Sequence, residues 1–147
     1  MIPSQPQAAD KTVSIHIRNR RDEIDRAEEQ LLAALVRHGY NDSARFAVRL
    51  AVEEAVSNAF NHGHKTLPPT TPIRFEFTVG PAEVLLVVED QGPGFTPSEV
   101  PDPTSDENLE LPSGRGLLLM RAYMASVEYS GRGTMLRMVY RNPVKPG

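Results

Sequence analysis

Apolar and polar residues alternate along residues 12–18 and 73–79, and this period of two predicts a half-buried strand in each place. Residues 83–89 are almost continuously apolar, which is typical of a strand near the centre of a sheet. The turn Gly80-Pro81 separates the second and third of these segments and favours an antiparallel hairpin. Two further strands are expected near the C-terminus, at residues 126–130 and 134–140.

Two longer segments have the period of a helix. Residues 21–38 carry one apolar stripe, and Gly39 follows at the place where a left-handed cap would end the helix. A polar residue at 41–43 can cap the second helix, which should run to about Asn61 and stop at Gly63. The apolar residues of this second helix cover most of its circumference, which predicts a largely buried helix. They include Phe46, Val48, Leu50, Val52, Ala55, Val56 and Ala59.

Residues 91–113 show neither period. They are rich in proline and acidic residues and contain few apolar ones. Loops of this length are usually functional or mobile, so we expect a lid over a binding site. A third helix is predicted at residues 116–125.

The order of elements is strand, two helices, two strands, lid, helix, two strands. Grouped elements of this kind predict an α+β fold, a two-layer sandwich in which helices cover one face of a mixed, mainly antiparallel sheet. A doubly wound fold would need strict alternation and a glycine-rich turn after the first strand, and neither is present. The sequence also contains no GxxxxGK[ST] phosphate loop.

The amino-acid composition mainly excludes certain classes of function. The chain has 147 residues, which suits one domain over residues 1–147 with loose tails at 1–11 and 142–147. A net charge of −3 gives no reason to expect nucleic acid, and the lack of cysteine excludes disulfides and thiol chemistry. No apolar run approaches the roughly 20 residues that span a bilayer. We therefore expect no membrane partner and a cytoplasmic location.

The first candidate functional residues lie on the second predicted helix. Glu54 and Asn58 are four residues apart and His62 follows after four more, so all three fall on one helix face. A carboxylate, an amide and an imidazole in one row could hold a metal-bound phosphate and accept a proton. A solvated helix face would show the same pattern.

Two glycine-bearing turns follow later in the chain. Asp90 stands where an apolar strand ends, and Gly92 and Gly94 permit a flat ligand to approach the backbone. Residues 113–117, Ser-Gly-Arg-Gly-Leu, precede a predicted helix, and free N–H groups there could bind an anion. Each motif alone could be an ordinary turn or helix entry. Thr134 opens the last strand and could be no more than a β-favouring residue.

Together these motifs are more specific than any one of them. In their order and spacing, the chain resembles the GHKL ATPase superfamily, whose nucleotide site is the Bergerat fold. The resemblance extends over residues 12–140, and the phrases EEAVSNAFNHG and SGRGLLLM are most similar to anti-sigma factor serine/threonine kinases of bacterial partner-switching systems.

The resemblance implies a role for each motif residue. Asn58 would ligate Mg²⁺ between the phosphates of ATP, and Asp90 would bind the adenine amine, with Gly92 and Gly94 shaping the pocket. The remaining nucleotide-binding residues would be Gly114, Arg115, Gly116, Leu117 and Thr134. His62 matches the motif too, although a structural role at the helix end remains open.

The resemblance also implies the reaction and the partners. Glu54 would be the general base toward a serine or threonine hydroxyl on a STAS-type anti-anti-sigma factor. A sigma factor would be a second partner, and a homodimer is suggested by the family alone. The alternative is a regulatory module that binds ATP or ADP and sequesters a protein partner without phosphorylating it.

Overall fold

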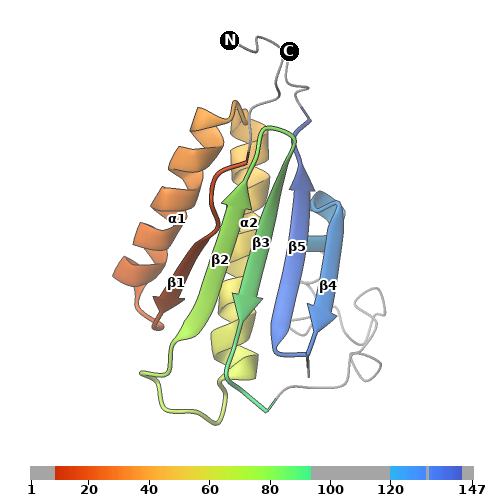
Figure 1. Cartoon of the computed structure of the whole chain (residues 1–147). Coiled ribbons are helices and arrows are strands. Elements are labelled where there is room, and N and C mark those ends of the chain that lie inside the picture. The colour runs from red at the N-terminus through yellow and green to blue at the C-terminus, as the bar shows by residue number, and fades with distance from the viewer. Residues whose placement is uncertain (1–8, 94–119, 132, 144–147) are drawn as a thin grey trace.

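A computed structural model describes residues 9–93, 120–131 and 133–143 (Figure 1). The strands are β1 (Val13–Ile17), β2 (Ile73–Val79), β3 (Glu83–Glu89), β4 (Ser126–Ser130) and β5 (Met135–Arg141). The long helices are α1 (Arg21–Arg37) and α2 (Asp42–Asn58), and the π-helical turn η1 (Ala59–Gly63) continues α2. The five strands form one sheet in the order β1-β2-β3-β5-β4, with α1 and α2 behind one face. The predicted α+β sandwich is therefore confirmed.

Every strand pairing in these residues is antiparallel, whereas we expected a partly mixed sheet. Consecutive strands are joined as hairpins at β2–β3 and β4–β5, and β5 returns beside β3. The predicted hairpin is confirmed, and the nearly continuous apolar strand β3 lies in the middle of the sheet, as expected.

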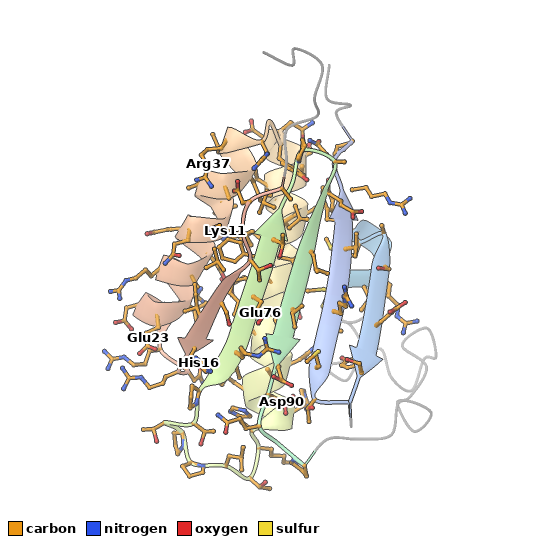
Figure 2. The ribbon with its side chains drawn as sticks, viewed as in Figure 1. Lys11, His16, Glu23, Arg37, Glu76 and Asp90 are labelled. Carbon is orange, nitrogen blue, oxygen red and sulfur yellow. The ribbon has the colours of Figure 1, made fainter. Side chains whose placement is uncertain are left out.

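The alternating pattern of β2 decides which face of the sheet is covered. Its four apolar residues are all buried, and the register places Phe75 between Ile15 of β1 and Val88 of β3. Glu76 lies on the opposite face, which is turned to the viewer in Figure 2 and is not covered by any of the described helices. The core therefore fills one side of the sheet only.

The ends of the helices follow the sequence signals. Gly39 has a φ of 78°, which glycine adopts without strain, and the Asn41 side chain accepts a hydrogen bond from the Ala44 N–H at 2.9 Å. Tyr40 lies between them, and its buried hydroxyl donates to the Gly80 carbonyl at 2.7 Å. This contact ties the α1–α2 connection to the β2–β3 turn.

The prediction of a largely buried α2 is wrong at Phe46, which is 64% exposed. In a two-layer fold the side of α2 that faces away from the sheet has no third layer to cover it. The residues of α2 that do pack inward are mostly small, including Ala44, Ala47 and Ala51, which lets the helix lie close to the strands.

The predicted third helix falls only partly on described residues. Residues 120–123 are helical, and Met120 and Met124 are buried in the core. Most of the predicted lid, from residue 94 onward, lies outside the described residues.

Asp10, which the sequence assigns to a loose tail, is held by several contacts. Its N–H donates to the Val79 carbonyl at 2.9 Å, and its carboxylate lies 2.9 Å from a guanidinium nitrogen of Arg37 and 3.1 Å from His38 Nε2. These contacts fix the chain just before β1 to the end of α1.

No helix within the described ranges has both the length and the apolar character needed to cross a lipid bilayer.

A buried carboxyl group lies between the two long helices. Glu28 of α1 is 3% exposed, and neither of its side-chain oxygens has a hydrogen-bond partner among the described residues. The carboxylates of Asp25 and Glu53 lie beside it, but Arg21 donates to both, so a guanidinium already supplies the positive charge there. Burial, and then the neighbouring Glu53 carboxylate, raises the pKa of Glu28 above its ordinary value of 4.5, although guanidinium nitrogens of Arg21 and Arg49, 3.6 and 3.3 Å from its oxygens, act in the opposite direction.

This raised pKa predicts that Glu28→Gln makes the protein more stable at alkaline pH. Between pH 4.5 and the raised pKa, the unfolded chain releases the Glu28 proton while the folded chain keeps it, so the free energy of unfolding falls as pH rises. Glutamine cannot ionise, so the variant does not lose stability in this way. Urea unfolding at a series of pH values should show a gain of about 1–3 kcal/mol at pH 8 and little change at pH 4.5.

The matched control is Glu29→Gln, which removes the same charge at an exposed neighbouring position. It should leave the pH dependence of stability as in the wild type. Parallel stability curves for wild type and Glu28→Gln would show that Glu28 is ionised in the folded protein.

Candidate functional site

A cavity of about 230 Å³ opens at the end of the sheet where β3 ends and β5 begins. Its walls come from the C-terminal end of α2, the π-helical turn, the end of β3 and the β4–β5 hairpin. Apolar side chains form much of the lining: Ala55, Ala59, Val88, Tyr129 and Leu136. Four predicted site residues also line it: Asn58, His62, Asp90 and Thr134. Residues from four separate segments are thus brought together at one place.

Asp90 is the acidic residue of this cavity, and Figure 2 shows it at the end of β3. Its N–H donates to the Thr134 carbonyl at 2.9 Å, which links the end of β3 to the start of β5. Its Oδ1 accepts a hydrogen bond from the Gly92 N–H at 2.8 Å. Both contacts hold the carboxylate at the mouth of an apolar cavity.

The electrostatic environment of Asp90 favours a hydrogen-bond donor as its partner. Burial raises the pKa of its carboxyl, while the hydrogen bond from the Gly92 N–H acts in the opposite direction. A half-buried acceptor is stabilised when a ligand N–H group replaces the water that it has lost. A ligand that carries an amine on a flat apolar ring would fit this cavity, because the ring would contact the apolar walls and the amine would donate to Asp90.

Two glycines let the end of β3 contact the π-helical turn. A Cβ on Gly92 would lie 1.9 Å from the Gly63 carbonyl oxygen, and a Cβ on Gly63 would lie 2.5 Å from Asp90 Cγ. Neither side chain could be added without moving backbone or the carboxylate. Gly92, predicted to shape the pocket, is not itself among the lining residues, but this contact allows Asp90 to reach its position.

The π-helical turn was not predicted. We expected α2 to run to about Asn61, but the α-helical pattern ends at Asn58, and the His64 N–H then donates to the Ala59 carbonyl at 2.8 Å, five residues back. Such turns frequently occur at functional sites. Here the turn brings Gly63 against Asp90.

The three polar residues predicted to share one face of α2 do not all reach the cavity. Asn58 and His62 line the cavity, whereas Glu54, one turn earlier and half-buried, does not. Within the described residues, the side chains of Glu54 and Asn58 make no hydrogen bond and no ion pair. No described residue therefore competes with a ligand for either side chain.

Thr134 lines the cavity, and its backbone carbonyl also accepts the Asp90 N–H. The preceding Gly133 is buried in the cavity wall with a φ of 80°, a value that favours glycine. Five other predicted residues lie outside the described ranges: Gly94, Gly114, Arg115, Gly116 and Leu117.

Sequence reasoning missed the apolar walls and His64. The imidazole of His64 is buried and accepts a hydrogen bond from the Gln91 N–H at 2.8 Å. This partner is a backbone group 27 residues away, so no motif could have indicated it.

A family model for the histidine kinase-like ATPase domain matches residues 17–140, which include every described residue of the cavity. The chain belongs to this family. The GHKL-type fold implied by the resemblance is confirmed, and the family implies a domain that uses ATP. A search of curated proteins finds no match to the chain.

For a histidine kinase-like ATPase domain, a cavity of about 230 Å³ is smaller than the roughly 300–1,000 Å³ of typical ligand pockets. The cavity suits the base of the nucleotide better than the whole molecule. The residues 114–116, which the resemblance assigns to the phosphates, belong to the part of the chain that the structure does not describe.

The contact between Gly63 and Gly92 predicts that Gly92→Ala destabilises this ATPase domain. The new methyl group would overlap backbone atoms that cannot rotate away. Overpacking of this kind typically lowers the free energy of unfolding by about 1–3 kcal/mol. Urea unfolding of the nucleotide-free protein measures this loss.

Gly80→Ala serves as the control, because its Cβ would come no closer than 3.2 Å to another atom and Gly80, like Gly92, does not have a positive φ. Gly80→Ala should lower the free energy of unfolding clearly less than Gly92→Ala does. Equal losses in the two variants would mean that the end of β3 does not pack on the π-helical turn.

Proposed function

We propose that this domain binds ATP with its adenine in the cavity and transfers the γ-phosphate to a serine or threonine hydroxyl of a STAS-type anti-anti-sigma factor. The observation that carries the proposal is Asp90, a half-buried carboxylate in a mainly apolar cavity within a domain of the ATPase family. The 6-amino group of adenine would donate to Asp90, and the ring would lie against Val88 and Leu136.

Asn58 fits the role of a Mg²⁺ ligand. Mg²⁺ prefers oxygen ligands and is usually held by one or two protein groups together with substrate phosphates and water. The Asn58 side chain lines the cavity and has no competing partner among the described residues. Asn58 would hold the metal at the cavity, where the ion would supply positive charge to the phosphates of the nucleotide.

Glu54 has a position compatible with a general base. It lies one helical turn before Asn58, outside the adenine cavity, where an attacking hydroxyl could reach it. In the transfer, the hydroxyl oxygen would form a bond to the γ-phosphorus while the bond to the β-phosphate oxygen breaks and ADP leaves. Glu54 would take the hydroxyl proton.

One observation favours the alternative of a nucleotide-dependent regulatory module. Among the described residues, no hydrogen bond or ion pair orients Glu54 toward the cavity. A catalytic base is normally held in place by a neighbour, so a module that binds ATP or ADP and sequesters its partner remains the second candidate. In either case a sigma factor is the partner that the family resemblance suggests.

We expect Asp90→Asn to weaken the binding of ATP and ADP by about 10- to 100-fold, because hydrogen bonds to a charged group contribute about 1.5–3 kcal/mol. Isothermal titration calorimetry in the presence of Mg²⁺ measures the affinity. Glu89→Gln removes a charge from the preceding residue, which pairs with Arg74, and should leave the affinity unchanged. Unaltered binding by Asp90→Asn would contradict the adenine assignment.

Glu54→Gln separates transfer from binding. The amide has the same shape as the carboxylate but cannot accept the proton, so phosphorylation of a STAS substrate should fall about 10²- to 10⁴-fold. Affinity for ATP should remain within a few-fold of wild type. Both are measured with labelled ATP and a STAS protein.

Glu53→Gln is the matched control, because Glu53 is adjacent in the chain but is bonded to Arg21 on α1. Its transfer rate should be close to wild type. Wild-type transfer in Glu54→Gln would remove Glu54 from the reaction, and no transfer in the wild type, with nucleotide binding intact, would favour the regulatory module.

A further inference from the structure

His64 stands directly after the π-helical turn and is 7% exposed. Its backbone N–H closes the turn on the Ala59 carbonyl, and its ring packs edge-on against Phe60, with centroids 5.7 Å apart. These contacts fix both the position and the orientation of the imidazole. Its Nε2 then accepts the Gln91 N–H at 2.8 Å.

An imidazole nitrogen that accepts a hydrogen bond from a backbone amide carries no proton. The neutral ring of His64 therefore holds its proton on Nδ1. A charged imidazole would present an N–H to another N–H and would lose this contact. The neutral side chain thus acts here as a fixed hydrogen-bond acceptor.

The backbone N–H that donates to His64 belongs to Gln91, the residue directly after Asp90. Gln91 is also held through its side chain, whose Nε2 donates to the Pro72 carbonyl at 2.8 Å. The next N–H, that of Gly92, donates to the Asp90 carboxylate. The segment after β3 is therefore attached at Gln91 to the chain that follows the π-helical turn, and at Gly92 to Asp90 itself.

We propose that His64 is a positioning residue for nucleotide binding, which acts by accepting the Gln91 N–H and so holding the Asp90 carboxylate at the cavity. The proposal rests on the proposed function, because it takes the cavity to be the adenine site. His64 is not among the residues that line the cavity, so its effect on a ligand passes through Gln91 and Asp90.

Two substitutions separate the acceptor from the ring. His64→Phe keeps an aromatic ring against Phe60 but offers no acceptor to Gln91. His64→Gln loses the ring but retains a side-chain oxygen that can accept. Calorimetry with ADP and Mg²⁺ should show a loss of about three- to tenfold in affinity for His64→Phe, with His64→Gln nearer to wild type.

The hydrogen bond between the Gln91 N–H and His64 can be tested in the ligand-free protein by hydrogen exchange of the Gln91 amide. In His64→Phe its hydrogen exchange should be faster than in the wild type, and in His64→Gln it should be slower than in His64→Phe. ¹⁵N NMR of the wild-type imidazole at neutral pH should show Nε2 without a proton. This last measurement needs no variant and applies even if a variant does not fold.

The outcomes distinguish this inference from the function on which it rests. Wild-type affinity in His64→Phe, equal weakening in both variants, or a protonated Nε2 in the wild type would each overturn the role of His64. If the wild type binds neither ATP nor ADP, the proposed function fails, and with it the effect on binding. The exchange of the Gln91 amide then still decides whether His64 holds the segment.

Discussion

The candidate site depends on one contact between backbones, that of Gly92 after β3 with Gly63 at the end of the π-helical turn. A single methyl group on Gly92 would come within 1.9 Å of the Gly63 carbonyl oxygen, so the two segments leave no room for a side chain at this position. This contact sets how far the end of β3 approaches α2. The position of Asp90 relative to Asn58 and His62 follows from it.

The same contact explains why the helix is irregular at its end. A regular α-helix through residues 59–63 would place Gly63 elsewhere, whereas the π-helical turn adds one residue per turn and directs Gly63 toward Asp90. The segment then carries His64 to the Gln91 N–H. Local departures from regular structure are expected where a site must be built, because a ligand requires a geometry that packing alone does not favour.

The sequence predicted the fold because its signals are local and repeated. Alternation in β2, the continuous apolar run of β3 and the caps at Gly39 and Asn41 each need only neighbouring residues, and the structure confirms them. The exposed Phe46 could not be predicted, since it depends on which side of α2 lacks a neighbour in a two-layer fold.

The site was only partly predictable for a related reason. Motif spacing named Asn58, His62, Asp90 and Thr134, and the structure brings all four to one cavity. The contacts that position them join backbone atoms: the Asp90 N–H with the Thr134 carbonyl, and Gly92 with Gly63. The first contact joins backbone groups that almost every residue has, so it leaves little trace in the sequence. The second requires glycine, but the sequence does not show which distant segment each glycine meets.

The central claim is that Asp90 recognises the 6-amino group of adenine. It is tested most directly by comparing the affinity for ATP with that for purine riboside triphosphate, which lacks this amine, in the wild type and in Asp90→Asn. The account predicts that the wild type binds ATP about tenfold or more tightly than the analogue and that the difference largely disappears in the variant. Equal affinity of the wild type for the two triphosphates would contradict it.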